Sequence, residues 1–261
     1  YIISTPPNLH TEYFLYAAKN KKHFFVEAGT DTVGYDELIP MLDDSFVAAP
    51  SCTFRYFPAV RQLKKFLEEG VIGKPLCFTH YLGQYLPDWH PYEDYRKVYF
   101  SQKGTGGCRE MFPYELIWLS DIFKSSVKKV QGIRGKISDL EMTADDIYIS
   151  TVQFENGVVG SMLIDILNRK AGRFLNIIGE DGTLEWDWLG KTISIFTQGE
   201  EKKVIDLSPG KKIAKYNTGE ESYEVEVADF IDAIVGNLTF PYAFKEDEYI
   251  LNTLDSFQSL V

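Results

Sequence analysis

The stretch YIISTPPNLHTEYFLYAAKNKKHFFVEAG (residues 1–29) decides the expected fold. Its apolar start predicts a strand that ends at Thr5-Pro6-Pro7. Residues 9–20 have one apolar face of helical period, and HFFVEAG (23–29) predicts a second strand, closed by Gly29. A short helix interrupted by Pro40 and a third strand, FVAAPS (46–51), follow. Strands that alternate with helices indicate a parallel sheet with right-handed crossovers.

From about residue 51 the pattern changes to a larger α+β unit. An amphipathic helix (58–70), a strand (75–86) and a helix with Pro113 in its first turn come first. Strand-forming runs follow at 146–154, 158–166 and 173–179 and continue to about 198. Asn156-Gly157 indicates a two-residue hairpin between the first two of these runs. Short turns between consecutive strands predict a largely antiparallel, open sheet, and two helices close the chain.

The composition is that of an ordinary globular protein, with 44% hydrophobic residues. Its formal net charge of −11 argues against nucleic acid or an anionic membrane as a partner. The three cysteines, Cys52, Cys77 and Cys108, are widely spaced and indicate free thiols in a reducing compartment, so we expect a cytoplasmic location. No His, Cys or Asp cluster has ligand spacing, and we expect no metal.

The expected division is an α/β part at 1–50 and a complete α+β domain at 51–261. The second half of a nucleotide-binding Rossmann sheet normally follows a first half that carries a glycine-rich phosphate loop. Since no GxGxxG stands in the chain, we expect residues 1–50 to be the second half of such a domain, with the loop lying before Tyr1. The alternative is a small flavodoxin-like module that starts at Tyr1.

The order of the motifs resembles the Gfo/Idh/MocA family, the glucose-fructose oxidoreductase and inositol dehydrogenase group. The markers are STPPNLH (4–10), HFFVEAG (23–29), RYFPAVRQLKKFLEEGVIGKP (55–75), GQYLPDWHPYEDYRK (83–97) and GTGGCREMFPYEL (104–116). This resemblance implies a Rossmann domain joined to a domain with an open mixed sheet, NAD or NADP as cofactor, and oxidation or reduction of sugars. The stretch GQYLPDWHP looks like members associated with nucleotide sugars or sialic-acid-like sugars.

Candidate cofactor-binding residues follow the ends of two predicted strands, where ligands of parallel sheets bind. At the first strand end the turn could equally serve only to end the strand before the helix begins. The residues are Thr5, Pro6, Pro7, Asn8, His10, Glu27 and Ala28, together with Arg96 further along the chain.

The resemblance also implies three catalytic positions, and all three differ here. The Glu-Lys-Pro motif of the family is Glu27-Ala28-Gly29, and the family's aspartate and histidine align with Met111 and Tyr114. We therefore expect other groups to supply the proton transfer that hydride chemistry needs: Tyr114, Glu110 and His90. A phenol needs a nearby cation to lower its pKa from about 10, and Arg109 is the candidate. We expect Gly106-Gly107 to bring the backbone close to the cofactor.

The expected substrate-binding residues lie in the same segments, and a surface or structural role is the alternative for several of them. The set is Arg55, Gln84, Tyr85, Asp88, Trp89 and Arg109.

The sequence thus predicts an NAD(P)-dependent oxidoreductase acting on a sugar, nucleotide sugar or related polyol. A catalytically silent relative that binds a sugar or dinucleotide is the main alternative, and a purely structural subunit is the third. An exposed apolar face of the antiparallel sheet would make a subunit interface, so we expect a homodimer or homotetramer.

Overall fold

The computed structural model describes residues 1–89, 91–207 and 221–260. The chain begins with a three-stranded parallel sheet of β1 (Ile2–Ile3), β2 (Phe24–Val26) and β3 (Ala48–Pro50), in that order. Helix α1 (His10–Lys19) connects the first two strands; α2 (Tyr35–Leu38) and the 3-10 turn η2 (Ile39–Met41) connect the next two. The strand and helix alternation expected for this region is confirmed.

The larger sheet has nine strands in the order β11-β10-β9-β8-β4-β7-β6-β5-β12. Only the β4–β7 and β5–β12 pairs are parallel, so the sheet is mixed, open and largely antiparallel, as predicted. Gly157 has φ +94° in the turn between β6 and β7, which agrees with the expected hairpin. The strands are β4 (Pro75–Tyr85), β5 (Val127–Gly135), β6 (Ile147–Phe154), β7 (Val159–Asp165), β8 (Leu167–Gly179), β9 (Gly182–Asp187), β10 (Thr192–Thr197), β11 (Lys203–Asp206) and β12 (Phe257–Ser259).

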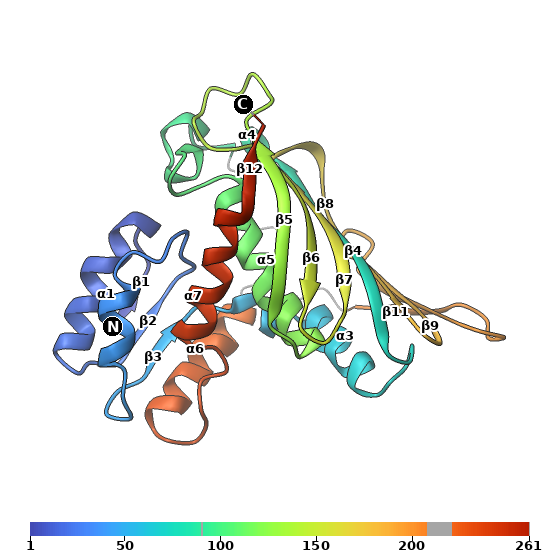
Figure 1. The fold of residues 1–261 in the computed structure, drawn as a ribbon, viewed down its shortest axis with the longest axis horizontal. Helices are drawn as coiled ribbons and strands as arrows, with labels where there is room; N and C mark the ends of the chain where they lie inside the picture. The colour runs from blue at the N-terminus through green and yellow to red at the C-terminus, as the bar shows by residue number, and fades with distance from the viewer. Residues whose placement is uncertain (90, 208–220, 261) are drawn as a thin grey trace.

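Helices fill the space between the two sheets. The buried helix α5 (Cys108–Phe123) packs against β6 and β7 on one side and α3 (Pro58–Glu68) on another, and α7 (Phe244–Asn252) packs against β3 (Figure 1). The remaining elements are the 14-residue helix α6 (Glu221–Ile234), the short α4 (Leu86–Trp89) and the 3-10 turns η1 (Pro7–Leu9), η3 (Thr53–Tyr56), η4 (Tyr95–Lys97), η5 (Tyr99–Ser101) and η6 (Thr253–Ser256).

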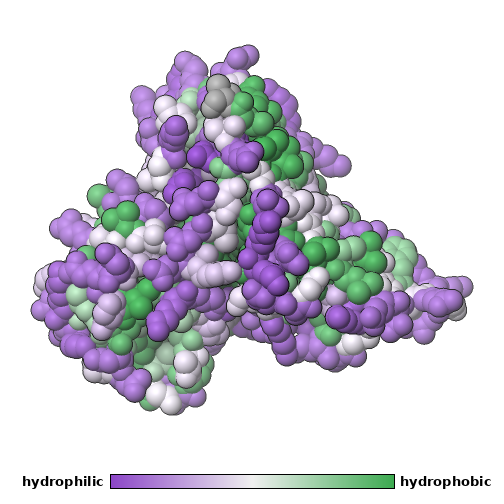
Figure 2. Space-filling model, viewed as in Figure 1, coloured by the Kyte–Doolittle hydropathy of each residue, from purple (hydrophilic) through white to green (hydrophobic). Residues whose placement is uncertain are grey.

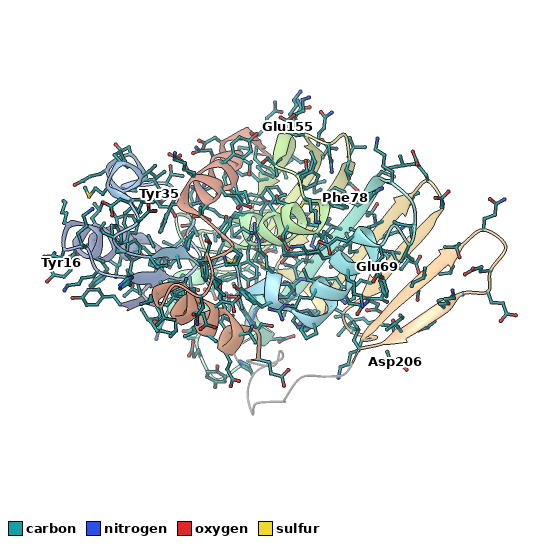
Figure 3. The ribbon with its side chains drawn as sticks, turned by 90° about the horizontal axis from the view of Figure 1, so that it is seen from below. Tyr16, Tyr35, Glu69, Phe78, Glu155 and Asp206 are labelled. Atoms are coloured by element: carbon teal, nitrogen blue, oxygen red, sulfur yellow. The ribbon has the colours of Figure 1, made fainter. Side chains whose placement is uncertain are left out.

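The core of the small sheet is completed by residues from the end of the chain. Phe25 packs against Phe230 of α6, with ring centroids 5.9 Å apart, and Phe24 packs against Phe244 of α7 at 5.7 Å. The hydroxyl of Tyr35 donates to Asp247 at 2.6 Å. In Figure 3, Tyr35 lies among the helices on the side of the small sheet, and Phe78 lies in the interior of the larger part. The division at residue 50 stays a prediction, and residues of α6 and α7 contact both parts.

The expected start of helix α5 is wrong by about a turn and a half. The helix begins at Cys108, after Gly107 with φ +63°, and Pro113 lies inside it. The backbone N–H groups of Glu110 and Met111 both donate to the carbonyl of Gly107, so the first turn forms ahead of the proline. Pro113 lacks only one helical hydrogen bond, which a buried helix tolerates. Tyr114 is therefore not in the first turn.

The two glycines before α5 serve packing within the chain. A Cβ on Gly106 would lie 2.1 Å from the carbonyl oxygen of Phe100, and one on Gly107 would lie 2.5 Å from that of Asp145. The close approach expected toward a cofactor is instead made to these two backbone segments.

Across the described residues, no helix combines the length and apolarity that crossing a bilayer requires.

Candidate active site

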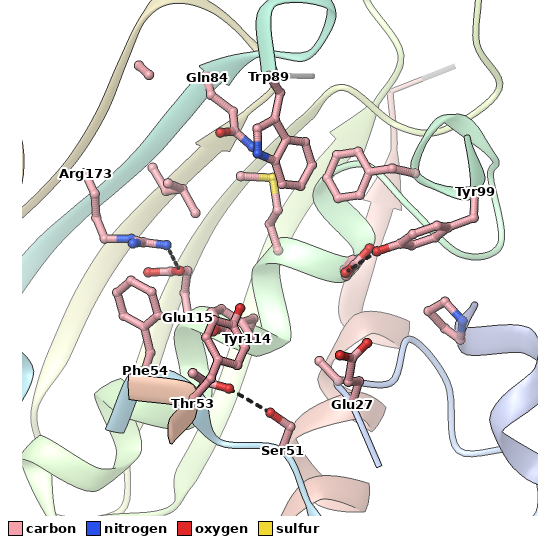
Figure 4. A pocket seen from close by; sticks show the side chains of 18 of the residues that line it. Glu27, Ser51, Thr53, Phe54, Gln84, Trp89, Tyr99, Tyr114, Glu115 and Arg173 are labelled. Carbon is pink, nitrogen blue, oxygen red and sulfur yellow. Dashed lines mark hydrogen bonds and ion pairs between the residues drawn. The ribbon is translucent and has the colours of Figure 1, made fainter. Parts of the chain in front are cut away.

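A cavity of about 410 Å³ opens between the carboxyl ends of the small sheet and the inner side of the large sheet (Figure 4). Strands β1, β2 and β3 all end at this cavity, and α5 crosses its floor. The residues singled out in the sequence that line it are Thr5, Pro7, His10, Glu27, Ala28, Gln84, Trp89, Glu110, Met111 and Tyr114. Segments expected to bind cofactor and segments expected to bind substrate therefore meet in one place.

The wall formed by the small sheet carries polar groups with few partners. Among the described residues, the buried Oγ1 of Thr5 has no hydrogen-bond partner. The ring of His10 lies with Nε2 2.8 Å from the carbonyl oxygen of Thr5, and burial lowers the pKa of His10. Burial also raises the pKa of Glu27. This wall thus offers a free hydroxyl at a strand end, where ligands of parallel sheets bind.

Glu110, in the first turn of α5, is a weakly partnered acid. Its Oε1 accepts a hydrogen bond from the hydroxyl of Tyr99 at 3.2 Å, and its buried Oε2 has no partner among the described residues. Burial, and then the nearby charge of Glu27, raise the pKa of Glu110 to about 8, although the Tyr99 hydrogen bond works against this. The group is therefore mostly protonated at neutral pH and can both give and take a proton near pH 8.

Glu115, on the same helix, has the opposite surroundings. Its carboxylate accepts from Arg173 Nη2 at 2.8 Å, from Trp118 Nε1 at 2.9 Å and from His80 Nε2 at 2.7 Å. Burial opposes ionisation, but these partners outweigh it, and the pKa of Glu115 is lowered. Glu115 and Arg173 both line the cavity, so an ionised, fully paired carboxylate lies at the side opposite Glu27 (Figure 4).

Tyr114 lies in the cavity wall as expected, but the reason given for its reactivity is wrong. Burial raises the pKa of its phenol well above the ordinary value. The positive charge of Arg173 lowers the pKa of Tyr114, but this effect is smaller than that of burial. Arg109 is not among the main influences on this pKa. Tyr114 is a neutral phenol, able to donate a hydrogen bond but not to hold a negative charge.

The three arginines proposed as ligands do not line the cavity. Arg55 is buried, pairs with Glu246, donates to the carbonyl of Pro241 at 2.8 Å and lies over the ring of Tyr242. Arg96 is exposed and bonds Asp94 and Glu141.

Arg109 acts electrostatically on Tyr148, outside the cavity. The charge that lowers the pKa of Tyr114 comes from Arg173 and not from the predicted Arg109.

The other predicted positions that the structure describes are also peripheral. Pro6, Asn8 and Asp88 are exposed and do not line the cavity, and Tyr85 stacks under Arg169 at 4.0 Å. His90 lies outside the described residues. Their roles remain predictions that the cavity geometry does not support.

Two cavity residues that sequence reasoning missed, Ser51 and Thr53, follow strand β3. Both are held by the buried carboxylate of Glu226, which accepts from Ser51 Oγ at 3.3 Å, from Thr53 Oγ1 at 2.5 Å and from the backbone N–H of Cys52. Burial raises the pKa of Glu226, against the effect of these donors. The signal that could have found them is their place at the third strand end.

Within the described ranges, no three His, Cys, Asp or Glu side chains gather closely enough to hold a metal ion. The expectation that no metal takes part stays a prediction.

Part of the chain matches a known protein family. Residues 60–185 match the model of the GFO/IDH/MocA C-terminal domain. Levoglucosan dehydrogenase of Pseudarthrobacter phenanthrenivorans is 36% identical over 90 residues, 33% of this chain and 22% of that protein. The 2,7-anhydro-N-acetylneuraminate hydratase of Escherichia coli K12 is 25% identical over 214 residues, 78% of this chain and 55% of that protein. The matches thus span about half or less of these curated relatives.

Solved structures share the fold. Levoglucosan dehydrogenase in complex with NADH superposes with a TM-score of 0.81 at 19% identity, covering 98% of this chain and 75% of that one. The UDP-N-acetylglucosamine 3-dehydrogenase GnnA from Acidithiobacillus ferrooxidans has a TM-score of 0.74 at 18% identity, with 98% and 76% coverage. Residues 60–185 thus form a C-terminal domain of the GFO/IDH/MocA family, and the chain as a whole shares the fold of these dehydrogenases.

Proposed function

We propose that the protein is an NAD(P)-dependent oxidoreductase that transfers a hydride to or from a sugar, a nucleotide sugar or a related polyol. The observation that carries the proposal is Glu110, a largely buried acid with a pKa of about 8 and a free oxygen in the cavity. A general acid or base works best when its pKa lies near the working pH. Relatives of the family have been solved with NADH, with levoglucosan and with L-sorbose.

The wall at the ends of β1 and β2 fits a dinucleotide. The unpartnered hydroxyl of Thr5 offers a hydrogen bond, and Pro7, His10, Glu27 and Ala28 shape the surface around it. When bound there, NAD or NADP would supply or accept the hydride. Thr5 and its neighbours would hold and orient it, and turnover with NADH against NADPH distinguishes the two cofactors.

The chain's own residues manage the proton. In the reducing direction the protonated Glu110 donates to a carbonyl oxygen as it gains charge, and in the oxidising direction the ionised form accepts the hydroxyl proton. Tyr114, held neutral by burial, can donate a hydrogen bond to the same oxygen. Gln84 and Trp89 line the opposite wall, where an amide and an indole can contact a sugar's hydroxyls and ring face.

The test uses the full-length protein with NADH and NADPH, a panel of sugars, and Glu110→Gln. We expect dinucleotide-dependent turnover of a panel member in the unaltered protein and a loss of about 10²–10⁴-fold in the variant. The matched control, Glu155→Gln, removes an exposed carboxylate in the turn after β6 and should leave the rate unchanged. Equal rates for both variants would remove Glu110 from the mechanism.

The second candidate is a catalytically silent relative that binds sugar or dinucleotide. It is favoured by Ala28 and Met111, which line the cavity where the family resemblance places a lysine and an aspartate. Binding of both ligands without turnover would support it, and so would a large gain of activity in Ala28→Lys. If the Glu110 mechanism holds, Ala28→Lys brings little gain.

We propose a homodimer or homotetramer built on the outer face of the large sheet. One row across adjacent strands is apolar: Ile133, Ile149, Leu163, Tyr81 and Phe174. Figure 2 shows hydrophobic residues over parts of this sheet. Light scattering that finds a monomer at high micromolar concentration would contradict this assembly. The cytoplasmic location also stays a proposal, consistent with Cys52, Cys77 and Cys108 being unpaired.

A further inference from the structure

The side of the cavity away from Glu27 and Tyr99 is built around a cation. Figure 4 shows Arg173 and Glu115 on one side of the space and Glu27 and Tyr99 on the other. Arg173, from β8, is the one Arg or Lys among the described residues that line the cavity. A guanidinium placed in a cavity wall needs an explanation, because a positive charge is costly to desolvate without partners.

Arg173 has donors to spare. Its Nη2 donates to Glu115, its buried Nε has no acceptor among the described residues, and its side chain is nine-tenths buried with 10% exposed. The ring of Phe54 lies 3.9 Å beneath the guanidinium carbon and fixes its plane. The side chain is thus held rigidly with part of its planar set of N–H groups unused, which is the geometry that recognises carboxylates.

Glu115 does not use up the donors of Arg173. Its carboxylate is shared with Trp118 Nε1 at 2.9 Å and with His80 Nε2 at 2.7 Å, so only Nη2 of Arg173 bonds it. Nδ1 of His80 lies 3.0 Å from the carbonyl oxygen of Phe174, which holds the ring in place.

We propose that Arg173 binds a carboxylate of the substrate, so that the ligand is a sugar acid and not a neutral sugar. The inference rests on the proposed function, since it names the substrate class of the same cavity. Arg173 pairs the ligand's carboxylate while Glu115, His80 and Phe54 hold the guanidinium in place. The sugar's reacting carbon then lies toward Glu110, on the far side of the cavity.

Geometry and charge favour a carboxylate over a phosphate. A single guanidinium whose plane is fixed matches the two oxygens of one planar carboxylate. A phosphate or diphosphate brings more negative charge, and Glu27 on the opposite wall would repel it.

The experiment compares acids with neutral partners of the same shape. Calorimetry on the full-length protein measures binding of D-glucuronate against D-glucuronamide, and of N-acetylneuraminate against its methyl ester. We expect at least one acid to bind about tenfold to a hundredfold more tightly than its neutral partner. The preference should weaken as salt rises, because it is electrostatic.

Three variants assign the preference to one side chain. Arg173→Gln should abolish it, and Arg173→Lys, which keeps a charge to pair with Glu115 but loses the planar set of donors, should reduce it. The matched control is Arg169→Gln, which removes an exposed arginine from the same strand and should leave the preference intact. Circular dichroism checks that each variant is folded.

The outcomes separate this inference from the proposed function. If neither acid binds more tightly than its neutral partner, or if the preference survives in Arg173→Gln, the carboxylate subsite is wrong. Dinucleotide binding, followed by NADH fluorescence in the same samples, tests the oxidoreductase independently. A protein that binds NADH but shows no acid preference keeps the proposed function and loses the subsite. A protein that prefers the acid but binds no dinucleotide keeps the carboxylate subsite and loses the proposed oxidoreductase function.

Discussion

Glu110 and Glu115 lie on the same helix and line the same cavity, yet their acidities move in opposite directions. Burial raises the pKa of Glu110 to about 8, whereas the pKa of Glu115 falls below its ordinary value. Desolvation is the largest single effect on the pKa of each acid, and it raises the pKa in both cases. The difference lies in the partners: one phenol for Glu110, and a guanidinium, an imidazole and an indole for Glu115.

The comparison shows that burial alone does not fix the charge of an acid. What decides it is the number of donors that surround the carboxylate once water is removed. A single helix can therefore carry an acid that keeps its proton in its first turn and an acid that ionises readily further along. The first role needs few partners and the second needs many.

Replacing Glu115 should have the largest effect. Glu115→Gln leaves the buried Arg173 without its counter-charge, and we expect a loss of about 3–5 kcal/mol in the free energy of unfolding. Urea denaturation at pH 7 measures it. Glu110→Gln, on the same helix, is the control and should cost less than about 1 kcal/mol, because it removes a poorly paired acid. Equal losses of unfolding free energy in the two variants would contradict the proposed difference between Glu115 and Glu110.

The second prediction concerns stability against pH. Below about pH 4.5 Glu110 is protonated whether the chain is folded or not; above that the unfolded chain loses the proton, while the folded protein keeps it up to about pH 8. The free energy of unfolding should therefore fall across this window and level off above it.

The change attributable to Glu110 should be about 1–3 kcal/mol, after allowing for solvent at the cavity mouth. Asp247, with a pKa of about 6, acts with the same sign, so the difference between the unaltered protein and Glu110→Gln is the quantity to measure. Identical pH profiles for the two proteins would show that Glu110 titrates normally.

The smallest expected effects are shifts in the pKa of Glu110 when its neighbours are replaced. Tyr99→Phe removes the hydrogen bond that lowers the pKa of Glu110, so the pKa should rise; Glu27→Gln removes a like charge, so it should fall. In the reducing direction, activity should decline as pH rises through this pKa, and the two variants should displace the decline in opposite directions. Displacement in one common direction would show that another group controls the profile.

Local patterns predicted the fold well. Alternating strands and helices at the start, the Asn156-Gly157 hairpin and the antiparallel runs depend on neighbours in sequence, and the structure confirms them. The predicted start of α5 was wrong because proline only tends to occupy the first turn of a helix. Gly107, with φ +63° just before the helix, was the better indication of where it begins.

The candidate site was predictable only where it follows strand ends or a motif. Thr5, Glu27 and Glu110 were found in this way, and all three line the cavity. Glu115 and Arg173 were missed because they meet across 58 residues of chain, between α5 and β8, and no spacing rule connects them. Arg109, the arginine nearest in sequence, was chosen instead and acts on Tyr148.

The packing of α6 and α7 on the small sheet has a consequence for biosynthesis. Tyr35 and its partner Asp247 are separated by 212 residues, and the aromatic rings that cover Phe24 and Phe25 also come late in the chain. At usual rates of translation, roughly 10–40 s pass between the appearance of the early strands on the ribosome and the arrival of the helices that cover them. During that time the nascent strands present bare aromatic surface, and they are the segment where we expect a chaperone to bind.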